Sequence, residues 1–235
     1  MRRASAPTAG RRRRMTKKDD VLKLLEELSP EERREIFTHL RQDIPIHPLE
    51  TNLNTTAEVI LEAISRSNDI TQRGIRGIIT EVEFLTSVLQ RLKGWTVVEL
   101  VGDVPNDFKI DDGHSEVGIQ VKMQRKEKGV AIVRRGKAVV EVQRTRTGVD
   151  ASGEPTRPYK FGEFDILAVS LHPSTNDWSR FMYTVGIWLL PRPHNGKLIR
   201  VMQPVSLAPN DDWTDSLLTC IEWFRSKRKK TIVGF

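Results

Sequence analysis

The chain has 235 residues, 38% of them hydrophobic, which is enough for one large domain or for one core with a helical extension. Its 38 basic and 31 acidic residues give a net charge of +7, and its single cysteine excludes an internal disulfide and argues against a cysteine-based zinc site. No run of about 18 apolar residues exists, and residues 1–14 lack the apolar block of a signal peptide, so a cytoplasmic protein without membrane spans is expected.

The amino-terminal third is predicted to be helical. A basic tail at residues 1–15 is expected to be disordered and to precede a helical region at 16–70. Apolar spacing predicts three helices, at Asp19–Leu28, Pro30–Gln42 and Thr56–Ser67. Ser29 is expected to cap the second helix, with Glu32 closing a capping box. The segment Asn68–Arg76 could also be the turn and start of a recognition helix in a helix-turn-helix.

The next predicted helix covers residues 74–93. It carries one apolar stripe that is expected to dock on a sheet, formed by Ile78, Val82, Leu85, Leu89 and Leu92. At about 100° per residue, Glu81 falls at the edge of this stripe, whereas Glu83 lies on the solvated face. Glu81 is therefore the carboxylate of this helix that can reach a site on the sheet. The alternative is that Glu81 pairs with a surface arginine.

The segment Pro105–Lys122 predicts a β-hairpin, preceded by a strand at Trp95–Leu100. The second half of the segment alternates strictly between apolar and polar side chains, which is typical of a half-buried strand. Asp112-Gly113 supplies the positive-φ residues that a two-residue type I′ turn needs. Such a turn fixes the register of the two strands.

In that register residue 107 faces 118 and residue 109 faces 116. One face of the hairpin then carries the side chains of Asp107, Gly118, Gln120 and Lys122. Gly118 would leave space above the Asp107 carboxylate for a hydrated cation. The alternative is an ordinary amphipathic hairpin, in which Lys109 bonds Glu116 on a solvated face.

The residue types on this face suit metal-assisted cleavage of a phosphodiester. Mg²⁺ prefers oxygen ligands, and Asp107 and the carbonyl oxygen of Gln120 can supply two of them. Lys122 can orient or help to deprotonate an attacking water, or stabilise charge that develops on the phosphate.

Asn106-Asp107 and Gln120-Val121-Lys122 resemble the motif of the PD-(D/E)XK nuclease superfamily, which holds most type II restriction endonucleases. The resemblance covers residues 74–190 best. Two positions depart from the family pattern. Asn106 interrupts the Pro-Asp pair, and Gln120 stands in place of an acid, which makes a second carboxylate more necessary. Family members often carry a metal-site glutamate in the first helix, so the resemblance assigns this part to Glu81.

A basic segment follows the hairpin. Residues 119–146 contain nine Lys or Arg and two acids, a balance that favours contact with a phosphate backbone. Two strands are predicted, at Val130–Val133 and Ala138–Thr145, joined by a turn at 134–137. Residues 143–147 offer amide and guanidinium groups that read purine edges. The candidate DNA-binding residues are Arg125, Lys126, Arg134, Arg135, Gln143, Arg144 and Arg146. The alternative is a solvated charged hairpin.

The remaining sequence predicts the rest of a sheet. A loop at Gly148–Pro158 precedes Phe164–Leu171, a continuous apolar run that is typical of a central strand. Asp165 within that run needs a partner, for which Arg157 and Tyr159 are the candidates. Two further elements are predicted: a strand at Met182–Leu190, and a helix capped by Asn210-Asp211 that carries Leu217, Leu218, Ile221 and Phe224. Cys220 lies on the apolar face of that helix and is expected to pack in the core.

The predicted fold is therefore α/β, with a restriction-endonuclease-like mixed β-sheet core at 71–235, flanked by helices, and an N-terminal helical extension. The resemblance implies a Mg²⁺-dependent type II restriction endonuclease that cuts double-stranded DNA, most simply as a homodimer. In this reading Asp107, Gln120 and Glu81 bind the metal and Lys122 acts on water and charge. Two alternatives are a repair or junction-resolving nuclease of the same superfamily and a non-catalytic DNA-binding regulator.

Overall fold

The computed structural model describes residues 16–42, 44–102, 104–144 and 157–235. The chain divides into two compact units, Met1–Ser67 and Asn68–Phe235. The expected tail at 1–15 and most of the expected loop at 148–158 lie outside the described residues.

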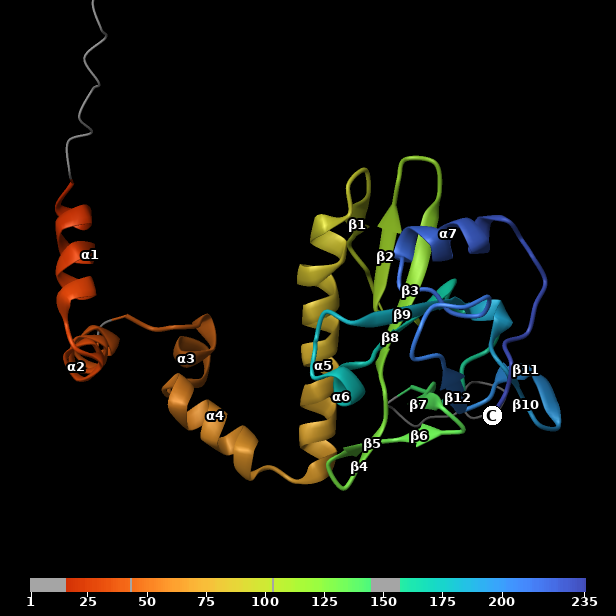
Figure 1. Ribbon diagram of the computed structural model, residues 1–235, viewed down its shortest axis with the longest axis horizontal. Coiled ribbons are helices and arrows are strands. Elements are labelled where there is room, and N and C mark those ends of the chain that lie inside the picture. Colours follow the sequence, from red (N-terminus) through yellow and green to blue (C-terminus); the bar gives the residue numbers. More distant parts are fainter. Residues whose placement is uncertain (1–15, 43, 103, 145–156) are drawn as a thin grey trace, which may run out of the picture. The chain divides into compact units, whose positions relative to one another are not determined.

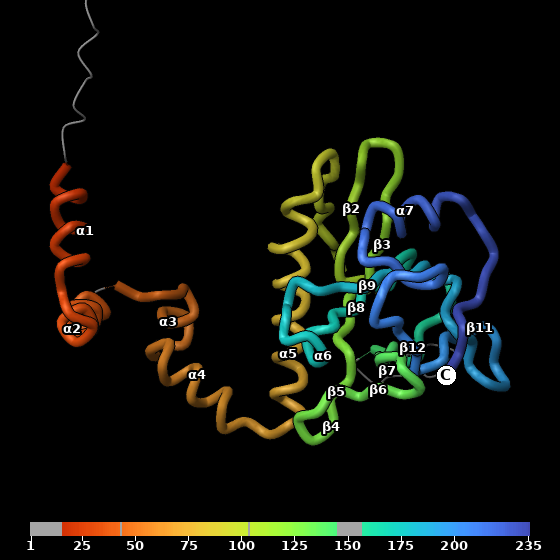
Figure 2. Tube along the Cα trace, viewed as in Figure 1, coloured from red at the N-terminus to blue at the C-terminus, as the bar shows by residue number. Residues whose placement is uncertain are grey.

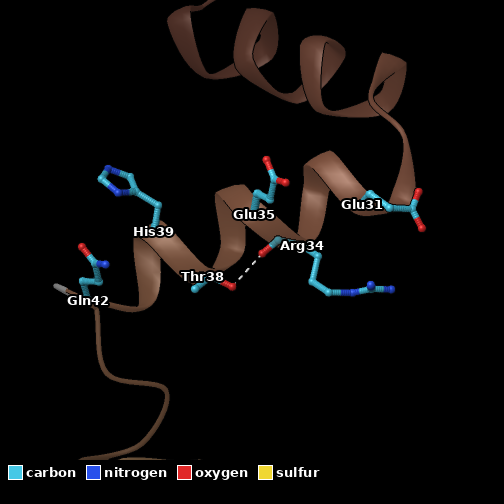
Figure 3. Close-up of a pocket in the computed structure, with 6 residues that line it drawn as sticks. All are labelled: Glu31, Arg34, Glu35, Thr38, His39 and Gln42. Atoms are coloured by element: carbon cyan, nitrogen blue, oxygen red, sulfur yellow. Dashed lines mark hydrogen bonds between the residues drawn. The ribbon is translucent and has the colours of Figure 1, made fainter.

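The amino-terminal unit contains four described helices: α1 (Lys17–Glu27), α2 (Pro30–Arg41), α3 (Pro48–Leu53) and α4 (Ala57–Arg66). The three predicted helices are confirmed as α1, α2 and α4. The capping box is confirmed too, because the Ser29 amide donates to the Glu32 carboxylate at 2.8 Å and the Ser29 hydroxyl accepts from the Glu32 amide at 3.3 Å. The six-residue α3 was not predicted, because it is too short to show a helical period. A hollow of about 540 Å³ lies along α2 and is lined by residues of that helix and by its C-cap, Gln42 (Figure 3).

Glu50 holds this unit together. Its carboxylate is only 8% exposed and pairs with the Arg41 guanidinium at 2.5 Å. It also accepts hydrogen bonds from the amides of Ile46 (2.5 Å), His47 (3.2 Å) and Ala57 (2.6 Å). One side chain thus joins α2, the segment before α3 and the start of α4. The hydrogen bond from Arg41 lowers the pKa of Glu50 to about 2, against the opposing effect of burial.

We expect Glu50→Gln to loosen this junction, because a neutral amide cannot replace a carboxylate that serves four donors. Hydrogen exchange at the Ala57 amide should become about tenfold faster or more at neutral pH, since hydrogen bonds to charged groups are the stronger ones. A lowered pKa means that the wild-type stabilisation is present above pH 4.5 and is lost as the pH falls towards 2. Glu62→Gln, in an exposed pair with Arg66, is the control; equal exchange in both variants would contradict the prediction.

The second unit is built on a five-stranded sheet in the order β1-β2-β3-β8-β9 (Figure 1). The strands are β1 (Thr96–Val98), β2 (Phe108–Asp111), β3 (Glu116–Met123), β8 (Ile166–Ser170) and β9 (Phe181–Val185). β3 and β8 are parallel and the other neighbours are antiparallel. The sheet is therefore mixed and the fold is α/β, as the sequence predicts.

The central strands follow from their side-chain patterns. In β3 the apolar side chains Val117, Ile119 and Val121 are buried on one face of the sheet. All five residues of β8 are buried, which confirms the predicted central strand. The predicted strand at Met182–Leu190 ends earlier, at Val185, where a 3₁₀ turn, η2 (Gly186–Trp188), begins. Gly186 lies against the backbone there, since a Cβ on it would come within 2.6 Å of the Phe164 carbonyl oxygen.

Helix α5 (Asp69–Ser87) packs against β3, and a 3₁₀ turn, η1 (Leu89–Arg91), follows it. Asn68 caps this helix, so residues 69–76 form its first two turns. Its buried face is formed by Thr80 and Phe84. The predicted stripe is wrong in its first half, because Ile78 and Val82 are 60% and 54% exposed.

An aromatic cluster explains this rotation of α5. The Phe84 ring packs against the rings of Phe108, Phe181 and Tyr183, with centroid distances of 5.6, 5.2 and 6.3 Å. These partners come from β2 and β9, so apolar spacing within the helix could not reveal them. Aromatic side chains bury more surface than Ile or Val, and so the face that carries Phe84 turns inward.

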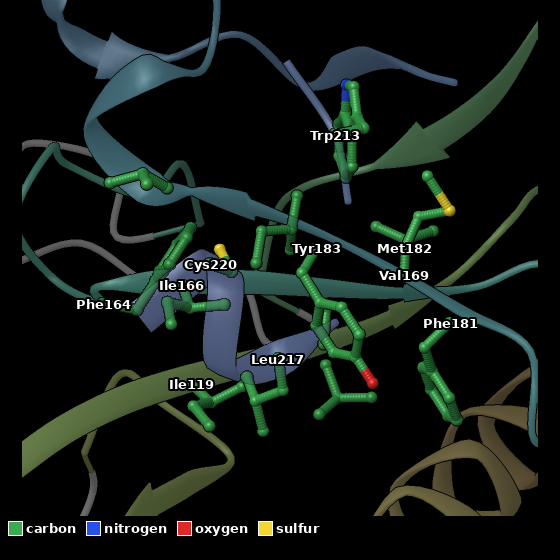
Figure 4. Packing of buried hydrophobic residues seen from close by; sticks show 14 of the residues in the cluster. Ile119, Phe164, Ile166, Val169, Phe181, Met182, Tyr183, Trp213, Leu217 and Cys220 are labelled. Carbon is green, nitrogen blue, oxygen red and sulfur yellow. The ribbon is translucent and has the colours of Figure 1, made fainter. Parts of the chain in front are cut away.

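Helix α7 (Leu217–Arg225) packs against β8 and β9 (Figure 4). Its cap is Ser216, whose hydroxyl accepts from the Thr219 amide, so the predicted cap at Asn210-Asp211 is wrong. The Asn210 side chain instead closes a turn, accepting from the amides two and three residues later at 2.9 Å. Cys220 is fully buried in the core, as predicted.

Three smaller sheets complete the unit (Figure 2). They are the sheet β12-β7-β6 and two hairpins, β4–β5 and β10–β11. The bounds are β4 (Lys126–Glu127), β5 (Val130–Ala131), β6 (Val133–Arg134), β7 (Lys137–Glu141), β10 (Pro191–Arg192), β11 (Asn195–Ile199) and β12 (Met202–Val205), and a short helix, α6 (His172–Thr175), follows β8. The predicted strand Val130–Val133 is thus divided, and the predicted strand Ala138–Thr145 corresponds to β7, which ends at Glu141; Thr145 lies outside the described residues. The turn between β6 and β7 has positive φ at Arg135 and Gly136. Across the described residues, every helix is too short or too polar to cross a bilayer.

Candidate active site

The hairpin of β2 and β3 has a longer turn than predicted. Lys109 faces Gly118 and Asp111 faces Glu116, so the expected pairing of 109 with 116 and of 107 with 118 is wrong by two residues. The cause is Asp112, whose carboxylate accepts from two amides of the turn at 3.1 Å and pairs with Arg225 of α7 at 2.8 Å. A slip of two residues keeps each side chain on its predicted face.

Gly118 consequently does not lie opposite Asp107, and the expected space above that carboxylate is not created by it. A Cβ on Gly118 would instead meet the carboxylate of Asp165 at 3.5 Å and the side chain of Asn106 at 3.6 Å. The Gly118 amide donates to the Asp165 carboxylate at 2.8 Å. This backbone group is the partner that the half-buried Asp165 needs, so the expected partners Arg157 and Tyr159 are wrong.

The corrected register brings Asp107 beside Gln120. Asp107 precedes β2, and its carboxylate accepts from the side-chain amide of Gln120 and, at 2.9 Å, from the Val121 backbone amide. The ammonium of Lys122 lies 3.7 Å from the same carboxylate oxygen. Gln120 is fully buried, whereas Asp107 and Lys122 are 23% and 21% exposed. The acid, the amide and the amine that the sequence singles out are therefore in contact.

The oxygen atoms at this position fit a hard divalent cation. The Gln120 carbonyl oxygen is buried and receives no hydrogen bond from the described residues. Both hydrogen bonds to Asp107 and its ion pair end on one carboxylate oxygen, Oδ2. Within the described ranges no three His, Cys, Asp or Glu side chains gather as a metal cluster. Asp107 and Gln120, with Glu81, are the residues that would hold Mg²⁺.

Glu81 reaches this site from α5. Its carboxyl is half-buried, and its pKa is raised to about 7, first by burial and then by the negative charge of Asp107. The positive charge of Lys122 acts in the opposite direction. Glu81 therefore shares one electrostatic environment with the hairpin residues, and near neutral pH its protonated and ionised forms are both populated.

Tyr159 is a neighbour of the site that the sequence did not single out for it. Its ring is 4% exposed and packs edge-on against Phe164 at 5.3 Å. The Lys122 ammonium lies 5.9 Å from the ring centroid and the Arg144 guanidinium 5.4 Å from it. Burial, followed by the charge of Asp107, raises the pKa of the phenol. An aromatic ring that touches both cations helps to fix the Lys122 side chain.

The candidate DNA-binding residues separate into different places. Arg125 pairs with Glu141 at 3.4 Å, and the Gln143 amide donates to the same glutamate. Arg144 pairs with Glu163 at 3.0 Å.

The others lie at hairpins. Arg134 and Lys126 are exposed on β6 and β4. Arg135 donates to the carbonyl of Phe235 at 3.0 Å. Arg146 lies outside the described residues. Among the described candidates, only Arg125 and Lys126 line the same hollow, and Arg134, Arg135, Gln143 and Arg144 do not line it.

The chain was compared with protein-family models, curated proteins and solved structures. No protein-family model matches the chain, and no curated protein matches it. Among solved structures, a bacterial homing endonuclease is similar over 46% of this chain and 62% of its own length, with 23% sequence identity and a TM-score of 0.29. The match spans less than two thirds of that protein, and a likeness at this TM-score has no bearing on what the chain does.

Proposed function

We propose that this chain is a Mg²⁺-dependent endonuclease that hydrolyses phosphodiester bonds of double-stranded DNA at a specific sequence, in the manner of a type II restriction enzyme. One observation carries the proposal: the carboxylate of Asp107, the buried amide of Gln120 and the ammonium of Lys122 meet at the start of β2, with Glu81 in their electrostatic environment. The resemblance of the motif to the PD-(D/E)XK superfamily gives this arrangement a known chemistry.

The residues divide the work between them. Asp107 and Gln120 offer oxygen ligands, and Glu81 adds the second carboxylate that the missing charge at position 120 calls for. When bound, Mg²⁺ supplies Lewis-acid polarisation of the phosphate and a more acidic water. Lys122, held between Asp107 and the Tyr159 ring, orients the attacking water and stabilises charge on the phosphate.

A digest of plasmid DNA tests the proposal. Purified protein with Mg²⁺ should give discrete fragments, and the same protein with EDTA should give none. Selective cutting of branched or damaged DNA would favour the repair or junction-resolving alternative. Protein that binds duplex DNA in Ca²⁺ and never cuts with Mg²⁺ would favour the DNA-binding regulator.

Two further properties belong to the same proposal. Cutting both strands at a symmetric site follows most simply from a homodimer with twofold symmetry, in which each copy supplies one site. The second property is a cytoplasmic location, because an enzyme of this kind would encounter DNA there. Sedimentation of the protein with and without a duplex measures the dimer directly.

The raised pKa of Glu81 predicts how cutting depends on pH. Because the proposed ligand is the carboxylate, its ionised fraction falls about tenfold for each pH unit below the pKa, which lies near 7. Single-turnover cutting at fixed Mg²⁺ should fall accordingly from pH 7 to 5.5. Glu81→Gln should cut more slowly and lose this slope, whereas Glu83→Gln should keep it.

The raised pKa of Glu81 also predicts how the stability of the fold depends on pH. Between pH 4.5 and 7 the folded chain binds more protons at Glu81 than the unfolded chain does, so this residue makes stability fall as the pH rises through that range. Glu81→Gln should remove that part of the pH dependence in denaturant unfolding. A variant whose cutting and unfolding follow the wild-type pH profiles would show that Glu81 is not part of the site.

A further inference from the structure

A basic hollow whose lining includes none of the proposed catalytic residues lies where the beginning of α5 meets the β4–β5 hairpin. Its volume is about 390 Å³. Five cations line it: Arg73 and Arg76 from α5, and Arg125, Lys126 and Lys128 from the hairpin segment. Both elements belong to the second unit of the chain. Two segments more than forty residues apart in the sequence thus place their positive charges around one space.

Few of these charges are neutralised. Arg76 pairs with Asp69 at 3.5 Å and Arg125 pairs with Glu141 at 3.4 Å. Among the described residues, Arg73, Lys126 and Lys128 form no ion pair with a carboxylate. Glu127 is the other acid at the hollow.

Arg76 also has an unsatisfied hydrogen-bond donor. Its Nε is buried and has no hydrogen-bond partner among the described residues. Unpaired cations together with an unused guanidinium donor suit a ligand that carries several anionic oxygens, as a phosphate does.

The hollow lies close to the candidate active site along both elements that form it. Glu81 lies five positions after Arg76 on the helix, a rise of about 7.5 Å. Lys126 lies four positions after Lys122, at most about 14 Å of extended chain. Duplex DNA advances about 3.4 Å per base pair, so one duplex can occupy the active site and reach the hollow a few nucleotides away.

We propose that this hollow binds a backbone phosphate of duplex DNA, a few nucleotides from the bond that is cut. The inference rests on the proposed function and adds to it a site that includes Arg73, Arg76 and Lys128. Lys128 is held at the tip of its hairpin by a turn with φ of 48° at Lys128 and 81° at Gly129. A phosphate contact of this kind fixes the register of the duplex on the protein without reading its sequence.

Two single variants test the hollow from its two sides. Arg73→Gln and Lys128→Gln each remove one exposed charge from a different element, so a folding defect common to both is not expected. Binding to a duplex in Ca²⁺ is measured over a series of salt concentrations. Each variant should weaken binding several-fold at low salt and reduce the slope of log K against log salt by about 1. The loss should be equal for duplexes with and without the cut sequence.

Arg192→Gln is the matched control, since it removes the same charge from β10, on the opposite side of this unit from α5 (Figure 1). Hollow variants that bind like Arg192→Gln, with an unchanged salt slope, would overturn the inference. If the wild-type protein still cuts DNA in that case, the proposed function stands without this phosphate site. A wild-type protein that neither binds nor cuts duplex DNA overturns both.

Discussion

Lys122→Ala lowers Mg²⁺-dependent cutting by about 10²–10³-fold or more, the usual loss when one group that stabilises transition-state charge is removed. Affinity for the same duplex in Ca²⁺ stays within a few-fold of wild type. The reason is the position of the ammonium, 3.7 Å from the Asp107 carboxylate and above the Tyr159 ring, where it faces the proposed metal site. Single-turnover cutting and equilibrium binding measure the two quantities separately.

Lys109→Ala is the control for this variant. Lys109 lies on the neighbouring strand and pairs with Glu116 at 2.9 Å, so its loss removes the same charge from the same hairpin. Lys109→Ala should therefore cut within a few-fold of the wild-type rate. Equal losses of cutting in both variants would mean that the hairpin contributes only general positive charge, and Lys122 would have no specific part in the reaction.

The sequence was sufficient to place the site residues on one face of the hairpin, even though the register predicted for it was wrong. The alternation of apolar and polar side chains from Glu116 to Met123 fixes the face of each residue, and a slip of two residues preserves it. The register itself depends on Asp112, which binds Arg225 more than a hundred residues away. No local pattern reports such a contact.

For helix α5, too, some features follow from the local sequence and others depend on residues far away in the chain. The helix and the choice of Glu81 over Glu83 follow from periodicity. The buried face does not, because it is decided by rings on β2 and β9 that meet Phe84. The predicted stripe residues Ile78 and Val82 remain exposed as a result.

Tyr159 and the basic hollow could not be predicted for a related reason. Tyr159 follows a loop with no periodic pattern, and it lies beside Lys122 in a setting that includes a backbone hydrogen bond from Ile199 of β11, forty residues later. The hollow joins Arg73 to Lys128 across two elements. In the sequence, Arg73 and Lys128 each look like an ordinary solvent-exposed charge.

Asp107→Asn should reduce Mg²⁺-dependent cutting by about 10³-fold or more, because it removes a carboxylate that contacts both Gln120 and Lys122. The fold should persist, since an asparagine oxygen can still accept the Val121 amide. A second effect is expected at Glu81. The negative charge of Asp107 helps to raise the pKa of Glu81 to about 7, so its removal should lower that pKa. Carboxyl NMR of labelled protein measures the change.

Asp165→Asn is the matched control for this substitution. Asp165 is a second half-buried carboxylate, and it accepts the Gly118 amide in much the way that Asp107 accepts the Val121 amide. The same change of charge at Asp165 should leave cutting within a few-fold of wild type and leave the pKa of Glu81 in place. If Asp107→Asn lowered that pKa but left cutting intact, the two carboxyls would be neighbours without being a metal site. The nuclease proposal would then lose the geometry on which it depends.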